Sequence, residues 1–362
     1  AGASILSIPV QHTGYNSALT DDAAMLRRSV VTLLRFRPLA VPSPSPPDPS
    51  PTTGLSMRIH SAFLVVIAFP LFACALGFAE SPVRQTMPLW PDGAPGAPEA
   101  ASTQPGDQPE LILTRVVSDR PTAAVVILPG GGYQTHAIDH EGYQFAEWFE
   151  SLGITSAICT YRHRGKGNGG EGYGHPYPML DAQRAIQTLR ARSREWNIDP
   201  NRIGVIGFSA GGHLCSTVST HFVKPDRNAK DLISRVSSRP DFAILCYPVI
   251  VFDQSHTHRG SQRNLLGENP DPELIESLSN ERQVSPKTPP TFLFHTAEDE
   301  PVPAENSLLY YRACLEHGVP AELHVFPKGR HGVGLARDIP GAKQWPELCH
   351  DWLGRIGVLN AE

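Results

Sequence analysis

The sequence lacks any concentrated stretch of basic residues, and its net charge is −5. This balance gives no electrostatic basis for binding nucleic acid, so we expect no nucleic-acid partner. No internal repeat is visible, and the hydrophobic content of 40% is ordinary for a globular protein. With 362 residues, the chain is long enough for one large domain or two small ones.

Cysteine is scarce, with six residues in the whole chain. None of them has the spacing of a metal-ligand pair, so the cysteines predict no metal site. Five follow residue 79, and this odd number, together with the apolar neighbours of Cys159 and Cys246, predicts buried free thiols. Cys314 and Cys349 lie in two late segments of helical pattern, so a disulfide between them stays open for an oxidising compartment.

The apolar run at 62–78 has about 17 residues and is interrupted by Pro70, which makes it marginal for crossing a bilayer. It follows a basic start and ends in a small-x-small pattern at 77–79. These features predict a secretory signal peptide over 57–79 and a secreted or periplasmic protein, with a lipid or membrane anchor as the alternative. We expect no stable membrane partner. The Pro- and Ser-rich sequence ahead of it predicts that residues 1–56 are a disordered, non-native upstream extension.

After a lead-in segment at 80–109, rich in Pro, Gly and Ala, the chain alternates β-type and helix-type patterns. Continuous apolar runs such as Ala123–Leu128 are typical of strands buried on both faces, and the 3.6-residue periodicity of Glu141–Leu152 predicts a helix. The alternation predicts one α/β domain over 110–362, with a mostly parallel sheet and helices on both faces. The other predicted strands are Leu111–Val117, Ile154–Tyr161, the short apolar run from Ile203 that enters Gly207, Asp241–Tyr247, Thr291–Thr296 and Ala321–Phe326. The other predicted helices are Met179–Arg194, His213–Phe222, Ala304–His317 and Trp345–Ile356.

The domain is organised around Gly207-Phe208-Ser209-Ala210-Gly211, which lies between a strand-type run and a helix-type run. A G-x-S-x-G pattern in this context is typical of a nucleophile elbow, which presents a serine hydroxyl on a tight turn. Gly207 and Gly211 have no Cβ to collide across that turn. Ser209 is therefore the predicted nucleophile.

A second glycine-rich turn, Gly130-Gly131-Gly132-Tyr133, directly follows the predicted strand Ala123–Leu128. Its N–H groups are unobstructed by side chains, and its place ahead of the G-x-S-x-G stretch predicts an oxyanion loop. We expect the N–H of Ala210 to be one oxyanion donor and the N–H of Gly131 or Gly132 to be the other.

A serine nucleophile needs a base to take its proton, and an imidazole base needs a carboxylate that orients it. In the α/β-hydrolase fold these groups follow successive strands in the chain order serine, acid, histidine. Here the loops after two later predicted strands carry Glu298-Asp299-Glu300 and His331. His331 is therefore the predicted base, and one of the three adjacent carboxylates is the predicted acid.

Two long insertions remain. Arg162–Pro178 is rich in glycine, histidine and tyrosine, and it predicts either the rim of a pocket or a surface loop. Val249–Asp271 contains His256 and His258, but no cluster of carboxylates or cysteines accompanies this pair as metal ligands. We therefore expect a polar lid loop there, and the sequence predicts no metal and no organic cofactor.

Several longer motifs lie between about Val125 and Leu335. Their sequences are LPGGGY (128–133), DHEGY (139–143), GFSAGGHL (207–214), HRGSQRNLLG (258–267), PPTFLFHTAEDEPVP (289–303) and HVFPKGRHGVGL (324–335). In these motifs the chain resembles the acetylxylan esterase-like, xylanase-associated carbohydrate esterases of the α/β-hydrolase fold, which have feruloyl-esterase-like relatives. The resemblance implies that Asp299 is the acid and that the loop around His258 borders the acyl pocket, with Tyr133 as a further candidate pocket residue. Pro129 takes the place of the His in the HGGG motif of lipases, so the lipase-type loop is matched only in part.

The resemblance and the motifs together predict a serine carboxylesterase that acts through an acyl-enzyme on Ser209. Its expected substrate partner is a small ester or a polysaccharide with acetyl groups, such as acetylated xylan. A prolyl-oligopeptidase-type serine peptidase, which shares the fold, is one alternative. The other is a non-catalytic binding module on a hydrolase scaffold, which would normally lack at least one of Ser209, Asp299 and His331.

Overall fold

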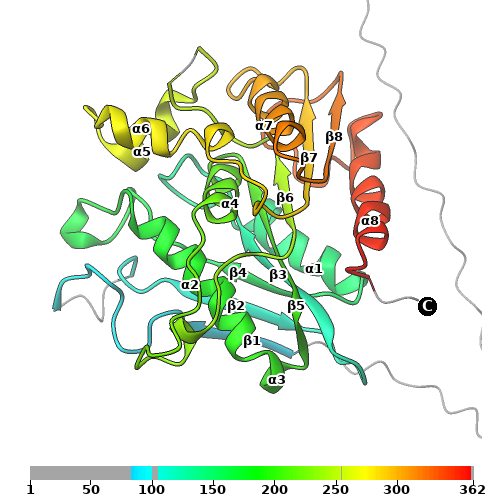
Figure 1. The fold of residues 1–362 in the computed structure, drawn as a ribbon. Helices are drawn as coiled ribbons and strands as arrows, with labels where there is room; N and C mark the ends of the chain where they lie inside the picture. Colours follow the sequence, from blue (N-terminus) through cyan, green and yellow to red (C-terminus); the bar gives the residue numbers. More distant parts are fainter. Residues whose placement is uncertain (1–82, 100–104, 254, 360–362) are drawn as a thin grey trace, which may run out of the picture. The chain divides into compact units, whose positions relative to one another are not determined.

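The computed structural model describes residues 83–99, 105–253 and 255–359 (Figure 1). The predicted upstream extension and the predicted signal peptide lie outside the described residues. Within them, one eight-stranded sheet has the order β1-β2-β4-β3-β5-β6-β7-β8, and no helix is both long and apolar enough to cross a bilayer. The strands are β1 (Val83–Pro88), β2 (Glu110–Arg115), β3 (Thr122–Leu128), β4 (Thr155–Cys159), β5 (Ile198–Phe208), β6 (Ala243–Cys246), β7 (Thr291–Thr296) and β8 (Ala321–Phe326). The helices are the π-helical turn η2 (Asp139–Tyr143), α1 (Gln144–Ser151), α2 (Tyr177–Ala191), α3 (Ser193–Trp196), α4 (Ala210–Thr220), α5 (Arg259–Leu266), α6 (Pro272–Ser277), α7 (Glu305–Glu316) and α8 (Trp345–Arg355), with short 3₁₀ turns between them.

The sheet is mostly parallel, as predicted. Strands β3 to β8 pair in parallel, whereas β2 is antiparallel to both β1 and β4. The central strands β3 and β5 are adjacent, and the chain moves outward from β3 to β4 on one side and from β5 to β6 on the other. At such a reversal, the loops that follow the two central strands diverge and leave a crevice at the carboxyl ends. The loops after β3, β5, β7 and β8 therefore meet at one edge of the sheet, where the predicted site residues lie.

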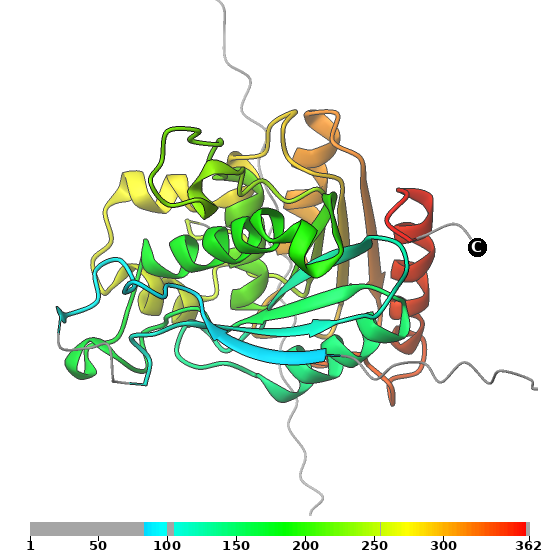
Figure 2. The same cartoon turned by 90° about the horizontal axis from the view of Figure 1, so that it is seen from below.

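Helices cover both faces of the sheet, as predicted (Figure 2). On one face, α2, α4 and α7 contribute Ile186, Leu214 and Tyr310 to a largely aliphatic core cluster. On the other, α1 and α8 contribute Phe145 and Trp345 to a cluster rich in aromatic side chains. Every residue of β3 and of β7 is buried between these layers, which explains the continuous apolar run of β3 and the apolar Phe292–Phe294 of β7.

The prediction of an irregular lead-in at 80–109 is wrong for residues 83–88, whereas the other described residues of the segment are irregular, as predicted. Residues 83–88 form β1, an exposed strand that pairs with β2 along its whole length. Just after it, Trp90 donates its indole N–H to Asp181 Oδ1 on α2 (2.8 Å), and Asp181 also pairs with the fully buried Arg162. Backbone pairing and buried polar contacts fasten this segment, so apolar periodicity could not reveal it.

The prediction of a polar lid loop at 249–271 is also wrong. Residues 249–252 are fully buried in the core, and Arg259–Leu266 forms helix α5. The helix has few apolar residues and includes Gly260, which is a poor helix former, so its pattern in the sequence is weak.

All five cysteines of the described residues are buried and free, as predicted. Cys314 on α7 and Cys349 on α8 belong to core clusters on opposite faces of the sheet. The disulfide that the sequence left open therefore does not form. Burial raises the pKa of both thiols, which keeps them protonated and unreactive near neutral pH.

Candidate active site

The G-x-S-x-G stretch forms the turn between β5 and α4, as predicted. Ser209 has φ 53° and ψ −117°, a conformation that residues with side chains rarely adopt. A Cβ built on Gly207 would lie 2.1 Å from the carbonyl oxygen of Gly211, and one built on Gly211 would lie 2.1 Å from that of Leu128. Only glycine fits at both positions, and the resulting tight turn presents the Ser209 side chain at the carboxyl edge of the sheet.

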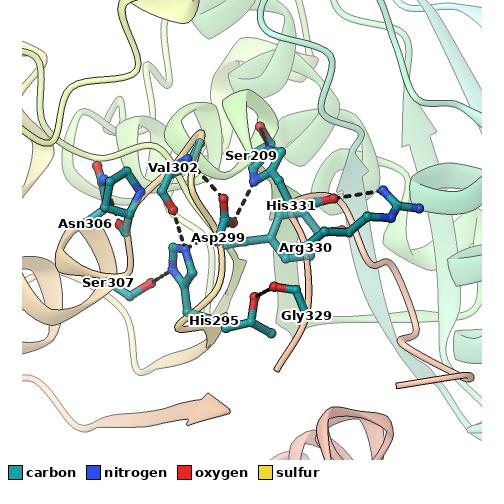
Figure 3. Close-up of polar contacts among 12 residues, drawn as sticks. Ser209, His295, Asp299, Val302, Asn306, Ser307, Gly329, Arg330 and His331 are labelled. Carbon is teal, nitrogen blue, oxygen red and sulfur yellow. Dashed lines mark hydrogen bonds and ion pairs between the residues drawn. The ribbon is translucent and has the colours of Figure 1, made fainter. Parts of the chain in front are cut away.

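The loop at 327–335, called the histidine loop below, brings His331 to Ser209 (Figure 3). His331 Nε2 lies 2.8 Å from Ser209 Oγ, and Nδ1 lies 2.7 Å from Asp299 Oδ2. With its proton on Nδ1, the imidazole donates to the carboxylate and accepts from the serine hydroxyl. The structure therefore brings together three side chains from the loops after β5, β7 and β8, in an arrangement suited to removing the serine proton.

Asp299 is the buried member of the three adjacent carboxylates, being 3% exposed, while the carboxylates on either side are exposed. Its Oδ1 accepts the N–H of Val302 at 3.0 Å, and the imidazole Nε2 of His295 lies 3.4 Å from Oδ2. Burial would raise the pKa of Asp299, but hydrogen bonds from His295 and His331 outweigh it and lower the pKa. Asp299 is therefore a fixed carboxylate that stays ionised near neutral pH.

The glycine-rich turn after β3, called the glycine turn below, lies directly against the elbow. A Cβ on Gly130 would lie 2.7 Å from the carbonyl oxygen of Phe208 and 3.0 Å from the Cβ of Ser209, so only glycine allows this approach. Among the described residues, the amide N–H groups of Gly131, Gly132 and Ala210 donate to no backbone acceptor. Free amide donors beside a serine hydroxyl are typical of an oxyanion hole.

The prediction that Tyr133 borders the pocket is wrong. The Tyr133 side chain is fully buried, and its hydroxyl lies 2.8 Å from Nδ1 of His213 on α4. The other ring nitrogen of His213 lies 2.9 Å from the carbonyl oxygen of Leu278, which can only accept, so that nitrogen carries the proton. Tyr133 therefore donates to Nδ1 and ties the glycine turn to the helix behind Ser209. The backbone of Tyr133 has a positive φ of 55°, and its side chain points into the core.

Replacing His213 is expected to reduce the acid sensitivity of the fold. Burial lowers the pKa of His213 to about 3, whereas an unfolded chain protonates histidine near pH 6.5. Between these values the unfolded state binds the extra proton, so stability falls as the pH decreases from 6.5 towards 3, by about 2 kcal/mol at pH 5. In guanidinium titrations at pH 7 and pH 5, His213→Gln should lose about 2 kcal/mol less than the parent between the two pH values. The same change at the exposed His350 should leave the parent's loss unaltered, and an unaltered loss in His213→Gln would contradict the expectation.

His258 lies at the N-terminus of α5, where its side chain caps the helix. Its Nδ1 lies 3.2 Å from the amide nitrogen of Ser261 and 2.8 Å from the hydroxyl oxygen of that residue. Burial and the nearby charge of His331 lower the pKa of His258, so the ring is a neutral neighbour of the site. Within the part of the chain that the structure describes, no group of three or more His, Cys, Asp and Glu side chains could hold a metal ion.

Two cavities adjoin the elements of the site. One, of about 560 Å³, opens beside His331 and is also lined by Glu298, Glu300, Pro301 and Arg330. The other, of about 670 Å³, lies beyond the glycine turn. Ser209 is not among the lining residues of either cavity. The insertion Arg162–Pro178, expected as a pocket rim or a surface loop, contributes His163, Gly165 and Lys166 to this second cavity.

Three buried polar residues around the site had no predicted role: Glu141, Tyr247 and His295. Tyr247 directly follows β6, and its ring lies edge-on to that of His331 at 5.3 Å. His295, near the end of β7, is within 2.8 Å of both Ser307 Oγ and the carbonyl oxygen of Val302. A histidine inside the apolar run of β7 was an available signal, because a polar side chain buried in a central strand requires partners.

Known proteins are similar to this chain in sequence and in fold. The family model described as BD-FAE matches residues 112–313, which is more than half of the chain. The crystal structure of an acetyl ester-xyloside bifunctional hydrolase from Caldicellulosiruptor lactoaceticus is 46% identical, with a TM-score of 0.72 over 78% of this chain and 99% of that one. An acetylxylan esterase of Xylanibacter ruminicola is 36% identical over 64% of this chain and 45% of its own length. An endo-1,4-beta-xylanase B of Butyrivibrio fibrisolvens is 37% identical over 59% of this chain and 33% of its own length, so the chain spans less than half of either curated relative.

Proposed function

The chain belongs to the BD-FAE family, and from that premise we propose that it is a serine carboxylesterase acting on short acyl esters of a polysaccharide. The observation that carries the proposal is the position of His331, whose two ring nitrogens lie 2.8 Å from Ser209 Oγ and 2.7 Å from Asp299 Oδ2. Free amide N–H groups beside Ser209 support it, because they provide donors where an oxyanion would form.

The reaction proceeds through an acyl-enzyme. Ser209 Oγ attacks the ester carbonyl while His331 Nε2 takes the hydroxyl proton, and Asp299 stabilises the imidazolium that results. The oxyanion accepts hydrogen bonds from the N–H of Ala210 and from the N–H of Gly131 or Gly132. Each of these two hydrogen bonds lowers the barrier by about 3 kcal/mol. His331 then protonates the leaving sugar oxygen. A water molecule, activated by the same imidazole, releases the acid from Ser209.

The proposed substrate is acetylated xylan, with acetyl as the acyl group. The names of the relatives support this choice, since one is an acetylxylan esterase, one an acetyl ester-xyloside hydrolase and one a xylanase. The residues that hold the nucleophile and the oxyanion specify ester cleavage and not the sugar, so the choice of polysaccharide rests on these relatives.

Acetate release from acetylated xylan tests the proposal, with the same xylan after alkaline deacetylation as the control. We expect acetate from the first polymer only, and a kcat/KM on 4-nitrophenyl esters that is highest for acetate and falls with acyl length. Hydrolysis of the aryl ester without release from xylan would overturn the polysaccharide assignment. Activity on neither substrate would overturn the esterase, and cleavage of a prolyl anilide peptide would favour a peptidase.

We also propose that the protein is exported by the signal peptide predicted over 57–79, which would bring the enzyme to a polysaccharide outside the cell. Support for this comes from the sequence pattern alone, in residues outside the described part of the chain. N-terminal sequencing of exported protein should give a start at Glu80, and a start before it would contradict the proposal.

A further inference from the structure

Glu141 is a buried carboxylate that the proposed reaction does not use. It is 2% exposed and lies in η2, the π-helical turn that precedes α1. Such turns are rare, and they occur frequently at functional sites. A buried carboxylate is costly unless its oxygens are hydrogen-bonded, so its partners indicate why it is there.

The two oxygens of Glu141 bind two different parts of the site. Oε2 accepts the backbone N–H of Gly130 at 2.7 Å, in the glycine turn that lies against Ser209. Oε1 accepts the hydroxyl of Tyr247 at 2.9 Å. The hydroxyl oxygen of Tyr247 in turn accepts the N–H of Gly334 at 3.0 Å, in the histidine loop.

The carboxylate therefore links the glycine turn to the histidine loop through one side chain. The link is one continuous chain of hydrogen bonds, which runs from Gly334 N–H through the Tyr247 hydroxyl and Glu141 to Gly130 N–H. Tyr247 also places its ring edge-on to His331, so the linking residue contacts the base itself. Neither loop belongs to a helix or strand, and their relative position depends on such contacts.

The chain of hydrogen bonds suits an ionised carboxylate. Both Glu141 partners donate, so two acceptor oxygens are needed and a glutamine in this place could satisfy only one of them. Burial raises the pKa of Glu141, and the nearby His140, the Gly130 N–H and the Tyr247 hydroxyl act against that rise.

We propose that Glu141 is a positioning residue that holds the oxyanion donors of the glycine turn at a fixed distance from His331 through Gly130, Tyr247 and Gly334. The inference rests on the proposed esterase function, because the distance matters only if Ser209 and His331 act on one substrate. Misplacement of such groups by about 1 Å lowers the rate of reaction by about 100-fold without weakening ground-state binding.

Two variants test this role. Glu141→Gln keeps the shape of the side chain but leaves one donor without an acceptor. Tyr247→Phe removes the hydroxyl, and with it both the bond to Glu141 and the bond from Gly334, while the bond between Glu141 and Gly130 stays. For both, we expect kcat on 4-nitrophenyl acetate to fall roughly 10- to 100-fold while KM stays within about 3-fold. The Ki of a trifluoromethyl ketone, which forms an anionic adduct on the serine, should rise by the same factor as kcat falls.

Folding is monitored in the same preparations by thermal unfolding and by titration of active serine with a fluorophosphonate. Glu150→Gln, in α1 and half-buried away from the site, serves as the matched control and should leave kcat unchanged. If kcat falls only in proportion to the fraction of protein with a titratable serine, the inference is overturned. The same holds if kcat and Ki of both variants equal those of the parent. A parent without activity on the aryl ester would overturn the esterase, and the inference with it.

Discussion

The Ser209→Ala variant is expected to lose ester hydrolysis, with kcat on 4-nitrophenyl acetate falling roughly 10⁴- to 10⁶-fold. The variant has no oxygen to form the acyl-enzyme, so the only remaining route is direct attack by water on an ester held at the oxyanion donors. KM should change little, because the serine hydroxyl adds almost nothing to ground-state binding. Initial rates of both proteins at several substrate concentrations measure the effect.

The outcome depends on the variant being folded. Alanine keeps the size of the site, and the backbone bonds of residue 209 to Cys246 and Val249 do not involve the side chain. We therefore expect a melting temperature at or slightly above that of the parent. Ser151→Ala, an exposed serine at the end of α1, is the matched control and should retain full activity. A Ser209→Ala protein with more than about one hundredth of the parental kcat would contradict the role of this serine.

The Asp299→Asn variant is expected to reduce kcat by roughly 10³- to 10⁴-fold. The carboxylate accepts the proton-bearing Nδ1 of His331 at 2.7 Å, which leaves Nε2 free to take the serine proton. An asparagine can present its amide NH₂ to Nδ1, and this favours the tautomer with the proton on Nε2, which cannot act as a base. The variant also loses the negative charge that stabilises the imidazolium. Steady-state kinetics with the aryl acetate measures the loss.

Glu300→Gln is the matched control for this change, because Glu300 is next to Asp299 in the sequence but exposed to solvent. It should keep kcat within about 2-fold, since a solvated carboxylate has little influence on His331. Equal losses in the two variants would mean that the charge of the loop, and not the bond to His331, supports catalysis. A folded Asp299→Asn protein with parental kcat would exclude Asp299 as the acid.

The strand pattern and the three site residues could be predicted because each has a local signal. Buried parallel strands such as β3 and β6 consist almost wholly of apolar residues, since both of their faces are covered. Ser209 lies in a turn whose glycines are required at fixed spacing, and His331 follows a strand in a glycine-rich loop. Among three adjacent carboxylates, however, the residue pattern alone gave no choice. The burial that selects Asp299 is a tertiary property, and only family resemblance identified it beforehand.

What the sequence could not reveal depends on contacts between distant segments. β1 is exposed at nearly every residue and exists because β2 offers it backbone partners, so no hydrophobic period marks it. The inward direction of Tyr133 depends on His213, which is 80 residues away. The Glu141 link joins segments around 130, 247 and 334, and no pattern within any one of them indicates the other two.

The backbone at Ser209 has a consequence for any attempt to evolve this protein. A non-glycine residue held at φ 53° and ψ −117° costs the fold on the order of 1–3 kcal/mol, and glycine would relieve most of that strain. A selection for heat resistance alone would therefore enrich glycine at position 209 and yield thermally stable variants without esterase activity. Screens on this scaffold need turnover in the same round as heating, because at this codon the two criteria favour different residues.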